Sequence, residues 1–250
     1  MDTITIEGWV LPEIRRVSIP DIDSISFKDP NGFEGIFKFK IRDGNVHVEC
    51  DIVSSCDNAL QFCTVRSLEL ATALVDIFAF SKGWALSVIV DFMTRGEERR
   101  PIALSEQSVQ AYCNAFQSAA EFQQLSNLVL PNLSLRFAFR DLVSSLSTLN
   151  YSAIAAARAV EVIRSQMASD TSESQAWEVM RNKLRIERSY LKFITDASRY
   201  PRHGNRGATD GGTQIVVTHR AWAIMTRYLE FLKRGGKEEL PEDMFPLLTA

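Results

Sequence analysis

The sequence lacks several features that mark familiar classes of protein. No two cysteines have C-x-x-C spacing, and the three histidines have no metal-ligand spacing, so neither a metal site nor another cofactor is expected. The sequence contains no P-loop, no G-x-G-x-x-G and no G-x-S-x-G motif. Nucleotide hydrolases, simple dehydrogenases and serine hydrolases of the standard kinds are therefore not expected.

Long apolar runs and a secretory signal are also missing. The longest strongly apolar stretch, residues 68–80, is interrupted by Glu69 and Asp76 and is too short to span a bilayer. The N-terminus begins Met-Asp-Thr-Ile-Thr-Ile-Glu, with neither a basic region nor an apolar segment. The sequence therefore predicts a cytoplasmic protein without a membrane span.

An excess of positive charge is absent as well. The chain has 28 Lys and Arg against 31 Asp and Glu, which gives a formal net charge of −3. This balance argues against broad, non-specific nucleic-acid binding, but it leaves room for a small basic site. The four cysteines are expected to be small buried hydrophobic residues, and they are Cys50, Cys56, Cys63 and Cys113.

The N-terminal part of the sequence is patterned mainly as β-strands. Alternating apolar residues predict strands at 3–10, 36–42, 46–52 and 85–93, with a further short strand around Ile25 and Phe27. Asp43-Gly44 predicts a hairpin turn, because glycine tolerates the positive φ that such turns require. Apolar residues at helical spacing predict one helix over 64–82, and residues 95–101 are interpreted as a turn or loop. A β-rich α+β domain over residues 1–104 is expected.

The pattern becomes helical after about residue 105. Helices are predicted at 105–125, 134–147, 151–168 and 173–198, and a last helix begins near Thr218 and closes at Gly235-Gly236. Ser172 and Gln175 form a plausible capping box. The expected fold class is α+β, with an up-and-down helical bundle over 105–236 and a surface tail over 237–250.

One loop carries a concentration of groups that suit phosphate chemistry. Arg199, Arg202, His203 and Arg206 lie within eight residues, and Pro201 is expected to stop the preceding helix. Arginine offers bidentate donors for phosphate, and a neutral imidazole can act as a general base. An alternative stays open, in which these arginines pair with nearby acids such as Asp196, Asp210 or Glu178 and only fasten the loop.

These residues, together with the stretches 157–164 and 176–181, resemble the HEPN superfamily, in particular ApeA- and MauJ-like bacterial proteins. The resemblance covers residues 135–235 and rests most on Arg202-His203-Gly204. It implies a homodimeric, metal-independent ribonuclease of toxin or antiviral-defence systems. His203 would be the general base, and Arg199 and Arg202 would stabilise the phosphate. The usual motif places four to six residues between arginine and histidine, whereas three separate Arg199 from His203.

Two further groups are assigned to substrate binding. Arg158 and Glu161 are i,i+3 neighbours that can pair, and in related bundles such a pair often faces the histidine loop. A plain surface pair stays open as the alternative. His219 and Arg220 are expected at the N-terminus of the last helix, where anions are favoured. Arg181, Arg185 and Arg188 share one side of the predicted 173–198 helix, as an exposed face or as an extension of the phosphate site.

Two functions from different classes therefore remain open at this point. The first is an RNA-directed protein that cleaves RNA. The second is a non-catalytic dimeric module that binds a protein or nucleotide partner, recruited through the N-terminal domain. The second function is compatible with the short spacing between Arg199 and His203, because non-catalytic HEPN members also exist.

Overall fold

A computed structural model of the chain describes all residues except 1, 29–31, 56–58, 103–117, 148–150, 169–170, 204–209 and 250. The chain divides into two compact units, Met1–Ala103 and Leu104–Ala250. The first unit is built on an antiparallel sheet and the second is helical, so the predicted α+β fold class is confirmed.

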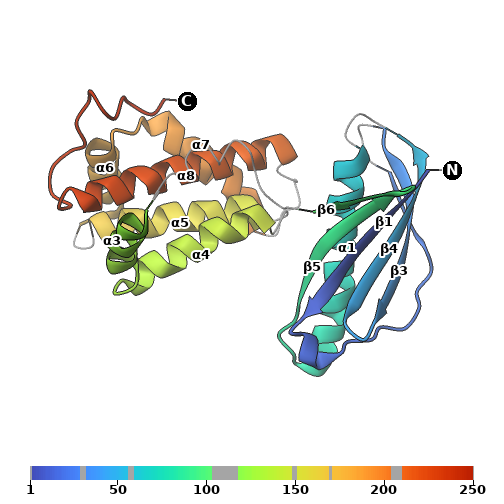
Figure 1. Cartoon of the computed structure of the whole chain (residues 1–250). Coiled ribbons are helices and arrows are strands. Elements are labelled where there is room, and N and C mark those ends of the chain that lie inside the picture. The colour runs from blue at the N-terminus through green and yellow to red at the C-terminus, as the bar shows by residue number, and fades with distance from the viewer. Residues whose placement is uncertain are drawn as a thin grey trace. The chain divides into compact units, whose positions relative to one another are not determined.

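The N-terminal unit is a six-stranded antiparallel sheet with one helix on it (Figure 1). The strand order is β2-β3-β4-β1-β5-β6. The strands are β1 (Asp2–Leu11), β2 (Ile25–Lys28), β3 (Glu34–Arg42), β4 (Asn45–Ser54), β5 (Ser87–Arg95) and β6 (Glu98–Pro101). A short 3₁₀ turn follows β1 at Glu13–Arg15, and helix α1 (Ala59–Lys82) connects β4 to β5.

Most strands of this unit lie where the alternation of apolar residues predicts them. The β3–β4 hairpin turns at Asp43 and Gly44, both of which have positive φ, and it pairs Phe39 with Val48 and Phe37 with Cys50. The prediction that residues 95–101 are only a turn or loop is wrong. That segment is a second hairpin, in which Gly96 turns β5 into β6 and the predicted loop residue Arg99 pairs with Thr94.

The core of this unit lies between α1 and one face of the sheet. Alternate residues of β1, β3 and β4 are buried there, including Ile4, Ile6, Phe37 and Val48. Cys50 on β4 and Cys63 on α1 are fully buried, with their sulfur atoms 3.4 Å apart. These two cysteines are buried small residues as expected, whereas Cys56 and Cys113 lie outside the described residues.

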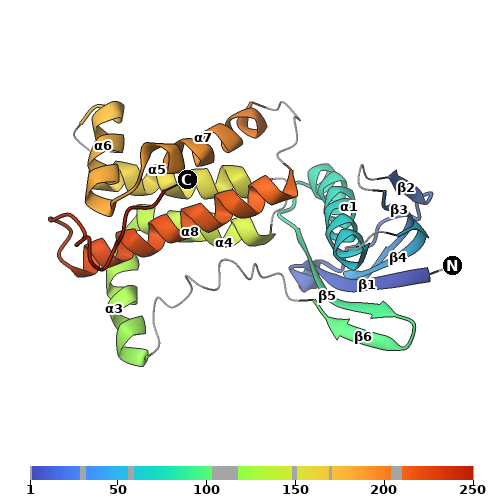
Figure 2. The same cartoon turned by 90° about the horizontal axis from the view of Figure 1, so that it is seen from above.

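The C-terminal unit consists of helices α3 to α8 in the part that the structure describes. They are α3 (Ala119–Val129), α4 (Leu133–Ser147), α5 (Ser152–Met167), α6 (Glu173–Leu184), α7 (Arg188–Arg202) and α8 (Gly211–Lys233). Helices α4, α5 and α8 lie lengthwise against one another, while α6 crosses the end of α5 (Figures 1 and 2). Most of the predicted 105–125 helix lies outside the described residues.

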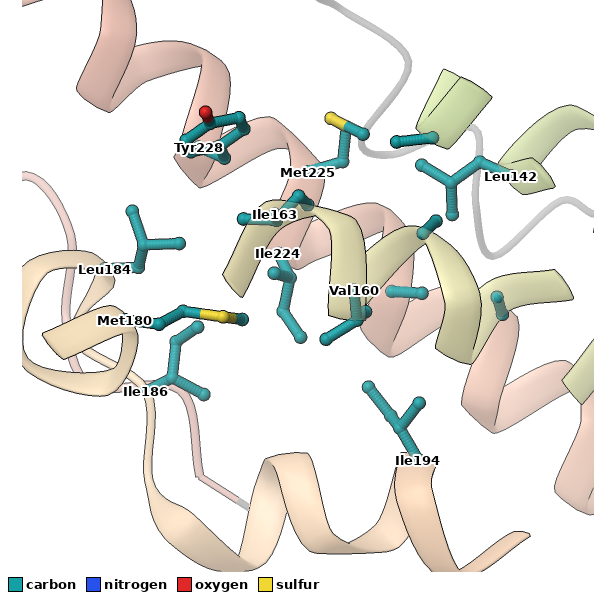
Figure 3. Close-up of a cluster of buried hydrophobic side chains, with 14 of the residues drawn as sticks. Leu142, Val160, Ile163, Met180, Leu184, Ile186, Ile194, Ile224, Met225 and Tyr228 are labelled. Atoms are coloured by element: carbon teal, nitrogen blue, oxygen red, sulfur yellow. The ribbon is translucent and has the colours of Figure 1, made fainter. Parts of the chain in front are cut away.

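Helix α5 forms the centre of this unit. Ala153, Ala156 and Ala159 are almost fully buried, and their small side chains let α4 and α8 approach the α5 backbone closely. Figure 3 shows the surrounding core, in which Val160 and Ile163 of α5 lie among side chains of α6, α7 and α8. Burial of these apolar groups is the main stabilising term for the unit.

Two of the predicted helix boundaries that are wrong in this unit lie at the end of α6 and at the start of α8. Residues 173–198 form two helices, because Arg185 adopts a left-handed conformation (φ 54°) that ends α6. The last helix begins seven residues before Thr218, since Asp210 accepts a hydrogen bond from the Thr213 backbone and caps α8 at Gly211.

The C-terminal tail takes part in the core and does not simply cover the surface. Leu240 is almost fully buried, and its backbone N–H donates to the Lys183 carbonyl. Leu248 pairs with the segment between α6 and α7 through backbone hydrogen bonds to Arg185 and Glu187. The tail therefore fixes the corner where α6 meets α7.

Candidate functional site

The residues that the sequence predicts to be catalytic lie at the C-terminal end of helix α7. Arg199 and Arg202 lie in its last turn, and His203 follows as the C-cap residue, with its backbone N–H donating to the Tyr200 carbonyl at 3.2 Å. Pro201 does not stop the helix as expected, since α7 continues through Arg202. The side chains of Arg199 and His203 are exposed, and Arg206 lies outside the described residues.

Arg202 is held by an acidic residue of α5. Its Nη1 lies 2.7 Å from Glu161 Oε1, and the two side chains are 30% and 35% exposed. The structure therefore brings Glu161 to the end of α7. This ion pair agrees with the alternative in which the arginines of the loop pair with acids. The acid comes from α5, however, and is not Asp196, Asp210 or Glu178.

Arg158 is directed to a different partner. Its Nε lies 3.4 Å from Asp141 Oδ2 of α4, whereas Glu161 holds Arg202. The expected Arg158–Glu161 pair is thus replaced by two ion pairs between different helices. Burial raises the pKa of the Asp141 carboxyl above its usual range, while the nearby Arg158 opposes that shift.

The pair His219 and Arg220 does not lie at a helix N-terminus. Helix α8 begins at Gly211, so both residues lie in its third turn. The Arg220 guanidinium packs over the rings of Tyr190 and Phe193, 4.6 and 4.4 Å from their centroids. Its Nη1 also donates to the Tyr190 carbonyl at 3.3 Å. Arg220 therefore fastens α8 to α7, and His219 is partly buried beside it.

The exposed face of α7 carries a row of cations. Arg188, Lys192, Arg199 and Arg202 are spaced by four, seven and three residues, so they recur on one side of the helix. We call these four residues the α7 cation stripe. At 1.5 Å per residue it extends about 21 Å along the axis. The adjacent face is buried, because Leu191, Ile194 and Ser198 pack into the core.

The charge around the stripe has the opposite sign to that of the whole chain. Residues 173–202 contain seven Lys and Arg but only four Asp and Glu, whereas the chain as a whole has a net charge of −3. Clustered positive charge on one surface favours anionic ligands by raising their local concentration. The α6–α7 segment is therefore a local basic surface on an acidic protein.

A pocket of about 360 Å³ opens in the corner between α6 and α7. Four lining residues come from each helix: Ser174, Trp177, Glu178 and Arg181 from α6, and Arg188, Leu191, Lys192 and Thr195 from α7. We call it the α6–α7 pocket. The sequence could not reveal it, because one continuous helix over 173–198 has no corner.

The break between the two helices separates the three arginines that were expected on one side. Arg181 and Arg188 line the α6–α7 pocket. Arg185 turns away to the tail, where its Nε donates to the Phe245 carbonyl at 3.0 Å and its guanidinium pairs with Glu239 and Glu242. Arg185 is therefore structural, and the other two remain available to a ligand.

The part of the chain that the structure describes shows neither a metal site nor a membrane-spanning helix. Its residues form no group of three or more His, Cys, Asp and Glu side chains that could hold a metal ion. None of its helices combines the length and the apolar composition that a transmembrane segment needs.

Comparison with known protein families gives two adjacent matches. Residues 4–104 match the domain of unknown function (DUF8168) N-terminal domain, and residues 120–233 match the domain of unknown function (DUF8168) C-terminal domain. The boundary between the two matches lies next to the division between the two compact units. No curated protein and no solved structure matches the chain.

Proposed function

We propose that this chain, which belongs to the DUF8168 family, is an RNA-directed protein whose helical unit binds RNA along the α7 cation stripe. The observation that carries the proposal is the alignment of Arg188, Lys192 and Arg199 on one exposed face that leads to His203. Single-stranded nucleic acid binds to basic surfaces that track its phosphates, mainly through the release of counterions. We place this activity in the cytoplasm.

Metal-independent cleavage is the catalytic form of this proposal. The exposed His203 imidazole would accept the proton of a ribose 2′-hydroxyl, whose oxygen then attacks the adjacent phosphorus to form a 2′,3′-cyclic phosphate. The 5′-oxygen leaves and takes a proton from water. Arg199 would stabilise the negative charge that develops on the phosphate oxygens. The resemblance to HEPN ribonucleases supports this form and adds a homodimer that pairs two such sites.

A second candidate is a non-catalytic binding or assembly module. The ion pair between Arg202 and Glu161 favours it, because Glu161 neutralises the cation next to His203 in the sequence. In this form the helical unit would still bind RNA or a nucleotide, and the N-terminal unit would recruit a protein partner. Where the module binds RNA, the two candidates share the binding surface and differ in whether the bound RNA is cut.

One experiment separates the two candidates. A pool of single-stranded and structured RNA is incubated with the full chain in EDTA, and both binding and cleavage are measured for the wild type and for His203→Ala. Cleavage that disappears in a folded His203→Ala protein supports the ribonuclease. Binding without cleavage by either protein supports the non-catalytic module. No RNA binding by the wild type contradicts the ribonuclease and the RNA-binding form of the module.

A further inference from the structure

The α6–α7 pocket has walls of two chemical kinds. Arg181, Arg188 and Lys192 contribute three cations, whereas Trp177 and Leu191 contribute apolar surface. Ser174 and Thr195 add hydroxyl groups, and Glu178 adds the only carboxylate in the lining. A ligand that fits these walls combines a planar or apolar part with at least one negative group.

The cations of the pocket are largely unneutralised. Among the residues that the structure describes, Arg181 and Arg188 have no ion pair within 4.0 Å. Lys192 has only a long contact to Asp196 at 3.8 Å, and both of these side chains are largely exposed. Exposed pairs of this kind contribute little, so an incoming phosphate would not have to displace a strong internal partner.

The aromatic wall is held in place by residues outside the pocket. The Arg164 guanidinium lies 4.9 Å from the centre of the Trp177 ring, and Arg164 is itself paired with Glu173. Trp177 also packs against the core of the helical unit. Because the ring is fixed before a ligand arrives, stacking a planar group on it would cost little side-chain entropy.

We infer that the α6–α7 pocket binds a nucleotide, with the base against Trp177 and the phosphate against Arg181, Arg188 and Lys192. Its volume of about 360 Å³ lies in the range of small-molecule sites and leaves most of the space unused by a bare phosphate. Guanidinium groups bind phosphate in a bidentate manner, and bases stack on aromatic side chains.

Glu178 adds a preference among the bases. A carboxylate accepts hydrogen bonds but donates none, so it suits the exocyclic amino group of adenine, cytosine or guanine. Uracil lacks that group, and its single N3–H donor lies between two carbonyl oxygens, which a carboxylate repels. We therefore expect adenosine monophosphate to bind more tightly than uridine monophosphate.

The inference deepens the proposed function and rests on it in one respect. Arg188 and Lys192 belong both to the pocket and to the α7 cation stripe, so a nucleotide of bound RNA could occupy the pocket. A free nucleotide has the same chemistry and is the other source of the ligand. Competition between the two distinguishes them.

The test is a calorimetric titration of the full chain with adenosine monophosphate, uridine monophosphate and inorganic phosphate. We expect Arg188→Ala and Trp177→Leu each to weaken adenosine monophosphate binding about tenfold, the effect of one charge-assisted contact or one stacking contact. Arg188 is exposed, so its variant should fold even if Trp177→Leu does not. Arg136→Ala removes an exposed arginine of α4 outside the pocket and should change nothing.

Displacement of a short labelled RNA by adenosine monophosphate would support the pocket as the place of an RNA nucleotide. Adenosine monophosphate binding without displacement would support it as a site for the free nucleotide. The inference is overturned if both variants bind adenosine monophosphate as the wild type does, or if inorganic phosphate binds equally well. It is also overturned if millimolar adenosine monophosphate does not bind, and RNA binding that persists in that case leaves the proposed function intact.

Discussion

Arg202 Nη1 lies 2.7 Å from Glu161 Oε1, which joins the last turn of α7 to α5. The pair is only partly buried, and its cation, Arg202, directly precedes His203 in the sequence. Glu161 thus has two consequences for an RNA ligand. It holds the Arg202 guanidinium in one position, and it cancels part of the positive charge at this end of the α7 cation stripe.

The first prediction concerns this ion pair. Glu161→Gln keeps an amide oxygen that can accept from Arg202 but removes the negative charge. We expect it to increase RNA affinity about threefold at low salt, because an RNA phosphate would no longer compete with the Glu161 carboxylate for Arg202. A partly exposed ion pair contributes up to about 1 kcal/mol, which sets the size of this effect. Fluorescence anisotropy with a labelled RNA measures the change.

The matched control is Glu230→Gln, which removes the same charge from a pair with Lys233 on α8. It should leave RNA affinity unchanged. A loss of affinity in Glu161→Gln, with the control unaffected, would mean that Glu161 is needed to position Arg202 and does not restrain it.

The second prediction concerns Arg227, a buried cation of α8. Its Nη1 donates to the carbonyls of Leu184 and Arg185, at 2.8 Å each, and its Nη2 donates to the Pro246 carbonyl. One guanidinium therefore ties the end of α6 to the C-terminal tail. Arg227→Leu would leave these carbonyls without that donor, and we expect it to lower the free energy of unfolding by about 3 kcal/mol.

Urea denaturation measures this loss, and Arg234→Leu provides the comparison. Arg234 is an exposed neighbour that stacks over Phe245, 5.4 Å from the ring centroid, so its loss should cost under about 1 kcal/mol. Equal effects of the two substitutions would contradict the role given to Arg227 at the corner between α6 and α7.

The third prediction concerns the pH dependence of the N-terminal unit. Hydrogen bonds from Lys38 Nζ (2.8 Å) and Thr3 Oγ1 (2.7 Å) hold the pKa of the Asp51 carboxyl below its usual value. A carboxyl with a lowered pKa stabilises the fold at pH values above its unfolded pKa of about 3.9. That contribution is lost as the pH falls through the folded pKa.

Asp51→Asn should therefore lower the free energy of unfolding by about 1 kcal/mol at pH 7. The difference from the wild type should begin to shrink below about pH 4 and should vanish below the lowered folded pKa, where the wild-type carboxyl is also neutral. Denaturant titrations at pH 7, 5 and 3 give the three values. A difference that grows toward pH 3 would have the wrong sign for this explanation.

The sheet and the central helices could be predicted because their signals are local. Gly44 permits the positive φ of the hairpin turn, and alternating residues on either side face α1. Ser172 caps α6 through a reciprocal hydrogen bond with Gln175, as its spacing predicts. Each of these features depends on residues close together in the sequence.

The corner between α6 and α7 could not be predicted in the same way. It depends on Arg185, whose left-handed conformation is fixed by contacts with Glu239, Phe245 and Leu248 in the tail. Helical spacing continues through the corner, since Leu184 and Leu191 fit one stripe. The spacing of apolar residues therefore could not predict the α6–α7 pocket, which forms at this corner.

The start of α8 was missed for a related reason. Gly211 and Gly212 disfavour a helix by their intrinsic propensity, so the local sequence does not indicate a helix start at Gly211. Asp210 overrides that propensity by accepting from both the backbone and the hydroxyl of Thr213. The shift carries His219 and Arg220 into the third turn, where Arg220 packs on Tyr190 and Phe193 instead of facing an anion.

The central claim is that the exposed cations of α7 bind RNA, and charge reversal tests it most directly. RNA affinity is measured across a range of salt concentrations for the wild type, for Arg188→Glu/Arg199→Glu and for Arg136→Glu/Arg140→Glu, which reverses two exposed arginines of α4. We expect the α7 variant to lose at least about tenfold in affinity and to show a shallower salt dependence, because fewer counterions are released. The α4 variant should retain the wild-type salt dependence, and equal losses in both double variants would contradict the claim.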